Sequence, residues 1–135
     1  VIENVGAALR EIGEHAEGTG VDCNLEMHGD FYRWQYTLRA VEIADHDSIG
    51  IVYNCDRRET QWGPISTFIE PVAGYLRHVH LHDIESGDYP YQDLFRILRN
   101  IGYGNYLSLE ASPSEDPERV LALYARLYEC MYQLA

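Results

Sequence analysis

The sequence predicts an α/β fold in which parallel strand–helix units form part of a (β/α)8 barrel, and three observations favour it. Four short apolar segments each end in a side chain that can bind a metal, namely Glu26, Asn54, His80 and Glu110. Successive members of this set are 28, 26 and 30 positions apart, about the length of a strand, a crossover helix and the return to a parallel strand. Finally, polar and apolar side chains alternate along three of the segments.

The alternation favours a barrel wall over an open sheet, because side chains two positions apart share one face of a strand. The predicted polar faces are Asp22, Asn24 and Glu26, then His78, His80 and His82, and then Tyr106, Ser108 and Glu110. An open parallel sheet is covered by helices on both faces and is apolar throughout. A barrel can instead turn one face towards a polar interior that holds a ligand.

Helical spacing of apolar residues predicts the segments between the strands. The predicted helices span residues 2–16, 37–46, 64–76, 91–102 and 117–134. Pro71 should kink or split the third of these helices. In the last helix, Asp116 is the expected N-cap residue and Pro117 takes the first helical position.

These elements account for residues 1–135 as a single partial-barrel domain, with a leading helix and four strand–helix units. A complete (β/α)8 barrel needs about 250 residues, so four units are about half of one. The two outer strands, which end in Glu26 and Glu110, would each leave an unpaired edge. We therefore expect either that the chain is the C-terminal part of a longer protein or that two copies pair to close a barrel.

The composition argues against several classes of function. A formal net charge of −12 repels phosphate backbones, so we expect no nucleic-acid partner. All ten basic residues are arginines, which excludes lysine Schiff-base chemistry within this chain. No apolar run approaches the roughly 20 residues that span a bilayer, and the first residues carry acids where a signal peptide carries bases. We therefore expect no membrane association, a cytoplasmic location and three reduced cysteines.

Four motifs follow one another along the chain: LEMHGDF at 25–31, RHVHLHD at 77–83, SGDYPY at 86–91 and GYGNYLSLE at 102–110. They resemble motifs of the xylose isomerase-like TIM-barrel superfamily, specifically its sugar phosphate isomerase/epimerase branch. The corresponding family patterns are LExHGDF on the fifth strand, HVHLKD, a GxGDxPY turn and a closing GYxGYLSLE. The resemblance covers essentially the whole chain and implies the C-terminal half of a TIM barrel, strands five to eight.

The resemblance also implies a divalent metal, Mn²⁺, Co²⁺ or Mg²⁺, with Glu26, His80 and Glu110 among its ligands. On the sixth strand the family usually reads DxxH, a ligand Asp followed by a substrate-binding His, where this chain has Asn54 and Arg57. Asn54 can still offer a carbonyl oxygen as the fourth ligand. Because it brings no charge, we expect weaker binding of the cation.

The family mechanism further implies that Glu26 and Glu110 are the catalytic pair, of which one removes a proton next to the sugar carbonyl and the other returns it. The predicted substrate-binding residues are His28, Arg57 and His82, the last standing where the family usually has Lys. A guanidinium matches phosphate oxygens, although a solvated loop position is the alternative for Arg57. A polar barrel lining with satisfied hydrogen bonds is the alternative for His78 and His82.

The predicted function is therefore a metal-dependent isomerase or epimerase acting on a keto sugar or a sugar phosphate. An inosose-type dehydratase would use the same ligands and would differ in its product. An abasic-site endonuclease is also found on this fold, but it needs a basic groove that this acidic chain lacks. The non-enzymatic alternative is a catalytically degenerate or truncated member that binds a sugar or nothing, and a metal-free site would favour it.

Overall fold

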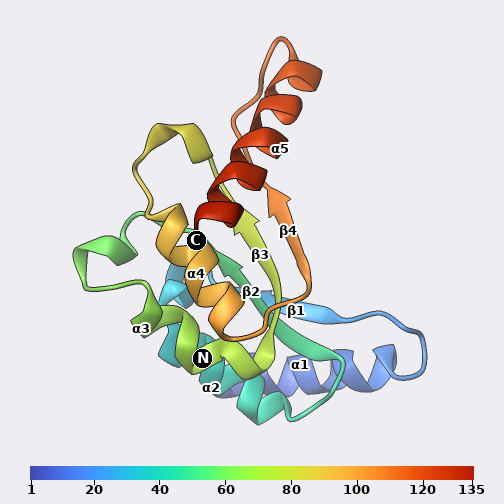
Figure 1. Cartoon of the computed structure of the whole chain (residues 1–135). Coiled ribbons are helices and arrows are strands. Elements are labelled where there is room, and N and C mark those ends of the chain that lie inside the picture. Colours follow the sequence, from blue (N-terminus) through green and yellow to red (C-terminus); the bar gives the residue numbers. More distant parts are fainter.

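The computed structural model describes residues 1–135, and its four strands form one parallel sheet in the order β1-β2-β3-β4. The strands are β1 (Cys23–Glu26), β2 (Ile49–Asn54), β3 (Leu76–Leu81) and β4 (Tyr106–Leu109). Each strand pairs in parallel with the next one along the chain, and helical segments make the crossovers (Figure 1). This arrangement confirms the predicted α/β fold of consecutive strand–helix units.

Five α-helices accompany the strands: α1 (Ile2–Ala16), α2 (Trp34–Ala44), α3 (Ser66–Ile69), α4 (Tyr91–Asn100) and α5 (Pro117–Leu134). The split predicted at Pro71 is confirmed, because α3 ends at Ile69 and a 3-10 helix, Glu70–Tyr75, continues the segment. Proline lacks the backbone N–H that an α-helix needs. The predicted cap of α5 is also confirmed, since the Asp116 carboxylate accepts a hydrogen bond from the backbone N–H of Arg119.

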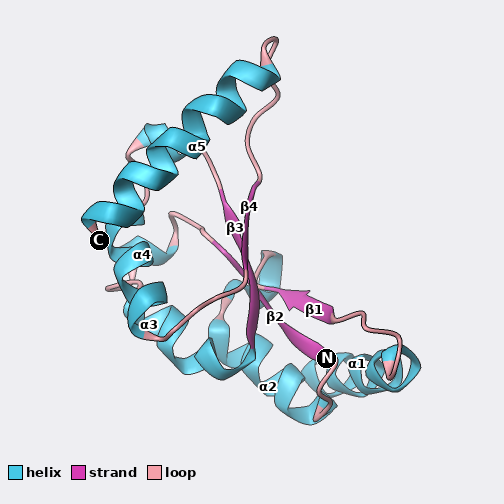
Figure 2. Ribbon diagram, turned by 45° about the vertical axis from the view of Figure 1, so that its right-hand side comes forward, coloured by secondary structure: helices cyan, strands magenta, loops and turns pink.

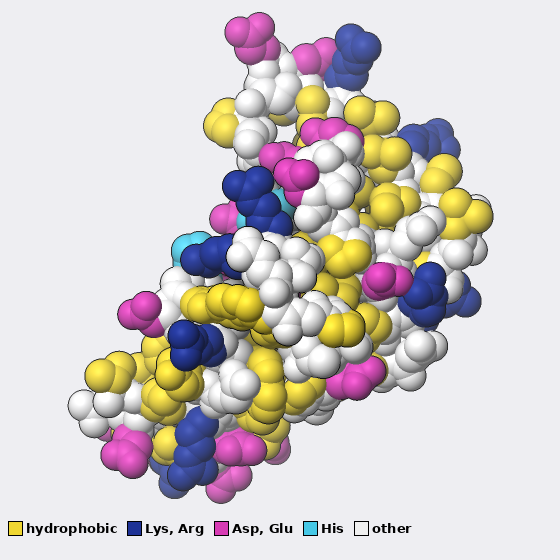
Figure 3. All heavy atoms as spheres, turned by 90° about the vertical axis from the view of Figure 1, so that its left-hand side faces the viewer, with side chains coloured by type: hydrophobic (Ala, Val, Ile, Leu, Met, Phe, Trp, Pro, Cys, Tyr) yellow, Lys and Arg dark blue, Asp and Glu magenta, His cyan; other side chains and the backbone are white.

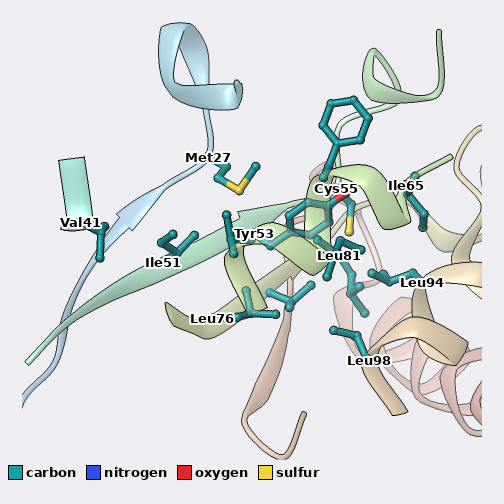
Figure 4. Close-up of a cluster of buried hydrophobic side chains, with 14 of the residues drawn as sticks. Met27, Val41, Ile51, Tyr53, Cys55, Ile65, Leu76, Leu81, Leu94 and Leu98 are labelled. Atoms are coloured by element: carbon teal, nitrogen blue, oxygen red, sulfur yellow. The ribbon is translucent and has the colours of Figure 1, made fainter. Parts of the chain in front are cut away.

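The helices lie on one side of the sheet, and the opposite face of the strands carries no helix (Figure 2). The core fills the space between the sheet and this helical layer. Figure 4 shows part of it, including Ile51 and Tyr53 from β2, Leu81 from β3 and Leu94 from α4, all of them buried. A sheet covered on one side is the wall of a barrel, as the alternation of polar and apolar residues predicts.

The uncovered face of the sheet carries the polar side chains. Nε2 of His78 on β3 lies 2.7 Å from Oγ of Ser108 on β4, and Nδ1 of His80 lies 3.2 Å from Oε1 of Glu26 on β1. Asp22 precedes β1, so it does not extend this face within the strand. Gly50 on β2 leaves room for the side chain of Arg77. A Cβ added at Gly50 would clash with it, because the Cβ would lie 2.2 Å from Cγ of Arg77.

Loops after the strands contain further short 3-10 helices, Gly29–Tyr32 after β1, Glu59–Gln61 after β2 and Ile84–Ser86 after β3. All three loops therefore start at the carboxyl edge of the sheet, where barrel proteins place their functional residues. None of the five helices is both long and apolar enough to cross a bilayer.

Candidate active site

Three of the four predicted metal ligands come together at the carboxyl edge of the sheet. Nδ1 of His80 lies 3.2 Å from Oε1 of Glu26 and 3.5 Å from Oε2 of Glu110. One ligand atom from each residue lies within 4.8 Å of the other two. Glu26 ends β1, His80 is the last residue but one of β3, and Glu110 directly follows β4. The strand ends thus bring together residues that are 84 positions apart in the sequence.

The chemistry of these three side chains fits a divalent cation. Two carboxylates and an imidazole suit Mn²⁺, Co²⁺ or Mg²⁺, and neither carboxylate forms an ion pair with an arginine. The Glu26, His80 and Glu110 side chains are 38%, 26% and 58% exposed, so an ion can reach them from the uncovered face. We call this set of three residues the rim cluster.

Asn54, the fourth predicted ligand, is buried at the end of β2 and contacts His82. Its Oδ1 lies 2.5 Å from Nε2 of His82, and Nδ1 of His82 lies 3.0 Å from the backbone oxygen of Glu110. Asn54 is therefore joined to the rim cluster through His82. Its role as a metal ligand stays a prediction.

A cavity of about 520 Å³ is connected to the rim cluster through His82, which lines it and contacts the backbone oxygen of Glu110, whereas none of the three rim-cluster residues lines it. The three predicted substrate-binding residues, His28, Arg57 and His82, all line it, together with Asn54. Its wall also contains Asp56 and Arg58, which lie outside the motifs, and Asp83, Asp88 and Tyr89, which lie within motifs but were not predicted as site residues. These belong to the loops after β2 and β3, whose course depends on tertiary packing rather than on a local sequence pattern.

Both arginines of the cavity face an acid. Nη1 of Arg57 lies 3.5 Å from Oδ2 of Asp88, and Nε of Arg58 donates a hydrogen bond of 2.6 Å to Oδ2 of Asp56. Burial acts to raise the pKa of Asp56, but hydrogen bonds and charge from Arg58 lower it below the ordinary value. Arginine and acidic side chains also lie side by side on the face shown in Figure 3. The positive charge of this cavity is thus balanced within the chain.

A buried polar cluster lies behind the cavity, on the helical side of the sheet. Glu59 is fully buried and accepts a hydrogen bond from the hydroxyl of Tyr53, which lies 2.7 Å from the hydroxyl of Tyr89. Its other oxygen, Oε1, has no hydrogen-bond partner. Burial raises the pKa of Glu59 to about 8, so its carboxyl group is largely protonated at pH 7. Glu59 stands in the polar run DRRET, where no periodicity indicates burial.

His78 behaves as a lining residue of the polar face. Its ring bonds the Ser108 hydroxyl, and burial, with the nearby His80 ring, lowers its pKa. A neutral, hydrogen-bonded imidazole fits the lining interpretation that the sequence left open for this position.

The one-sided parallel sheet, with its ligand cluster at the carboxyl edge, defines the chain as a partial (β/α) barrel with a candidate metal centre. The comparison with protein families agrees with this class. The chain belongs to the xylose isomerase-like TIM-barrel family, whose model matches residues 1–130.

Several solved structures are similar to the chain. L-ribulose 3-epimerase matches with 23% identity and a TM-score of 0.73, over 90% of this chain and 46% of that one. The apo form of 3-keto-D-glucoside 4-epimerase from E. coli matches with 21% identity and a TM-score of 0.73, over 90% and 52%. D-psicose 3-epimerase from Clostridium cellulolyticum H10, solved with D-tagatose, matches with 23% identity and a TM-score of 0.68, over 77% and 39%.

These similarities show the fold. The chain spans between 39% and 52% of the length of these three proteins, which is about half. No curated protein matches the sequence.

Proposed function

We propose that the chain is the metal-binding part of a divalent-metal-dependent isomerase or epimerase that transfers a proton next to the carbonyl of a keto sugar. The observation that carries this proposal is the convergence of Glu26, His80 and Glu110 within 4.8 Å at the carboxyl edge of the sheet. Family membership supports it, and the three similar structures named above are all sugar epimerases.

The positions of the two glutamates suit proton transfer at carbon. Glu26 reaches the site from β1, at one edge of the sheet, and Glu110 reaches it from the end of β4, at the other edge. A substrate carbon held between them can lose its proton to a carboxylate oxygen of one residue and receive a proton from the other. When bound, a divalent ion supplies Lewis acidity to the carbonyl and hydroxyl oxygens of the sugar. Asn54 completes the proposed ligand set.

The cavity lined by Asn54 and His82 supports a free sugar more strongly than a sugar phosphate. A volume of about 520 Å³ lies within the usual range for small-molecule sites. Arg57 and Arg58 are its only arginines, and both already face carboxylates. His28 offers ring nitrogens to a polyol, while a phosphate dianion would compete with Asp56 and Asp88 for the guanidinium groups.

We further propose that four more strand–helix units close the barrel. Both edge strands lack a second neighbour, and Tyr106 on β4 is 81% exposed. An apolar hollow of about 350 Å³ lies between β4 and α5, with Leu107 and Leu121 in its wall. The complementary units belong to an N-terminal half-barrel or to a second copy, and the charge of −12 per chain disfavours the second copy. Light scattering of the purified chain separates a dimer from a monomer that binds an added half-barrel.

The function is tested by metal binding and proton exchange together. The chain, alone and with a complementary half-barrel, is loaded with Mn²⁺, Co²⁺ or Mg²⁺ and incubated with keto sugars in D₂O. We expect one ion per site and deuterium incorporation, seen by NMR, at the carbon next to the carbonyl. Loss of water from the substrate would instead indicate a dehydratase. Bound metal without exchange would identify a degenerate member, and absence of both would contradict the proposal.

A further inference from the structure

His82 connects three strands at the carboxyl edge of the sheet. It directly follows β3, and its ring reaches the end of β2 on one side and the end of β4 on the other. Nε2 lies 2.5 Å from Oδ1 of Asn54, and Nδ1 lies 3.0 Å from the backbone oxygen of Glu110. The backbone oxygen of Glu110 can only accept, so Nδ1 of a neutral ring donates to it, and Nε2 accepts from the Asn54 side chain once that amide turns its nitrogen towards the ring. The backbone N–H of His82 donates to the hydroxyl of Tyr91, at 3.0 Å.

Glu110 needs such support because it stands one residue beyond an edge strand. Its backbone N–H donates to the oxygen of Leu81, at 2.7 Å, which holds one side of the peptide. Its side chain is 58% exposed. No further strand lies next to β4 to hold this residue from the other side, since β4 pairs only with β3. The bond from His82 holds the carbonyl group of the same residue. Fixing this residue before an ion arrives reduces the conformational entropy that binding must remove.

We propose that His82 is a positioning residue, which fixes Asn54 and the backbone of Glu110 relative to each other and so preorganises the metal centre. This inference rests on the proposed metal site. It differs from the substrate contact expected for His82, because groups of the protein engage both of its ring nitrogens. Residues that hold metal ligands in place typically contribute about 10- to 100-fold to metal affinity or activity.

Two substitutions separate hydrogen bonding from packing. His82→Phe keeps an aromatic ring but removes both hydrogen-bonding nitrogens, and we expect it to weaken Mn²⁺ binding by about 10- to 100-fold. His82→Lys places an ammonium group, which has three donors and no acceptor, between the same two oxygens. We expect the lysine variant to recover affinity to within about threefold of the original chain, since an ammonium can donate both to the backbone oxygen of Glu110 and to Oδ1 of Asn54.

The matched control is His78→Phe. His78 lies on β3 and on the same polar face, and its ring bonds Oγ of Ser108 rather than Asn54 or the backbone of Glu110. Phenylalanine keeps the ring that packs edge-on against His80, at 5.3 Å between the ring centroids. We expect its Mn²⁺ affinity to change by less than about threefold, because no proposed ligand loses a hydrogen bond. Calorimetry gives the affinity, and the electron paramagnetic resonance spectrum of bound Mn²⁺ reports a change in ligand geometry without any assay of activity.

The outcomes distinguish this inference from the proposed function. Equal Mn²⁺ affinity of the original chain and His82→Phe would overturn the positioning role while leaving the metal site intact. A loss that His82→Lys does not restore, or that His78→Phe reproduces, would also overturn it. If His82→Phe does not fold by circular dichroism, His82→Leu, which also has no hydrogen-bonding side-chain group, takes its place with the same expectation of weakened binding. An original chain that binds no Mn²⁺ would overturn both proposals.

Discussion

Two sets of glutamates lie near the carboxyl edge of the sheet, and their surroundings are opposite. Glu26 and Glu110, in the rim cluster, are partly exposed and contact only His80 among charged groups. Glu59 lies on the helical side, fully buried and bonded to Tyr53, with its pKa raised to about 8. The same type of side chain is therefore open to a cation in one place and largely protonated in the other. The exposure and the protonation of a carboxylate thus depend on the face of the sheet on which it lies, rather than on its distance from the edge of the sheet.

The two settings meet on β2, where successive residues point to opposite faces. Tyr53 turns towards the helical layer and donates to Glu59, whereas Asn54 turns towards the uncovered face and contacts His82. A single peptide unit thus separates Tyr53, the partner of the buried acid, from Asn54, the proposed metal ligand.

The largest expected effect comes from removing a rim carboxylate. Glu26→Gln or Glu110→Gln keeps the shape of the side chain but removes the proton acceptor, so proton exchange at the substrate carbon should fall by about 10²- to 10⁴-fold. Exchange is measured by NMR in D₂O with saturating metal. Glu59→Gln is the matched control and should exchange at close to the original rate, since Glu59 does not face the rim. An equal loss in the control would erase the distinction between the two settings.

The pH dependence of stability should come mainly from Glu59. Its pKa is about 8 in the folded chain and ordinarily 4.5, so the folded state holds the proton more tightly than the unfolded state does. Its contribution is fully present below about pH 4.5 and is lost as the pH rises through about 8. At about 1.4 kcal/mol per pKa unit, the loss amounts to several kcal/mol.

Glu59→Gln should flatten that pH profile, because glutamine carries no ionisable proton. Urea unfolding at pH 5, 7 and 9 gives the free energy of unfolding for the original chain and the variant. Glu14→Gln, at an exposed position of α1, is the control and should keep the original profile. If the variant and the original chain lose the same free energy of unfolding between pH 5 and pH 9, a group other than Glu59 causes the pH dependence of stability.

Most of the fold could be predicted because it depends on local and periodic signals. The spacing of the strand ends gave the parallel order, Pro71 gave the split between α3 and the following 3-10 helix, and Asp116 gave the start of α5. The helix predicted at 37–46 starts three residues earlier and ends two residues earlier, at Trp34 and Ala44. Its caps carry no side-chain hydrogen bond from which the sequence could reveal its ends.

The candidate site divides in the same way. Glu26, His80 and Glu110 could be found because each stands at the end of an alternating strand, and parallel strands bring such ends to one edge. The burial of Glu59 and the bridge made by His82 could not be found. Both depend on where loop residues and neighbouring strands lie in three dimensions, and no sequence period records that.

Removing the hydroxyl that holds Glu59 should have a moderate effect. Tyr53→Phe leaves the buried carboxyl without its hydrogen-bond donor and leaves the Tyr89 hydroxyl without a partner, so we expect a loss of about 1–3 kcal/mol in the free energy of unfolding. Urea unfolding at pH 6 measures it. Tyr103→Phe removes a hydroxyl that bonds the backbone oxygen of exposed Tyr106 and should cost less than about 1 kcal/mol. If the two variants lose the same free energy of unfolding, the hydrogen bond to the buried carboxyl stabilises the fold no more than a bond to an exposed backbone oxygen does.

The smallest effect is expected at the exposed acids of the cavity, which provide a third setting for a carboxylate. Asp88→Asn frees Arg57 from an ion pair whose partners are 75% and 59% exposed, and such pairs contribute at most about 1 kcal/mol. Stability should therefore stay almost unchanged. Binding of inorganic phosphate, followed by ³¹P NMR, should strengthen because a guanidinium becomes available. If the original chain already binds phosphate as tightly as Asp88→Asn, the acids do not restrain the arginines, and a sugar phosphate becomes the better substrate class.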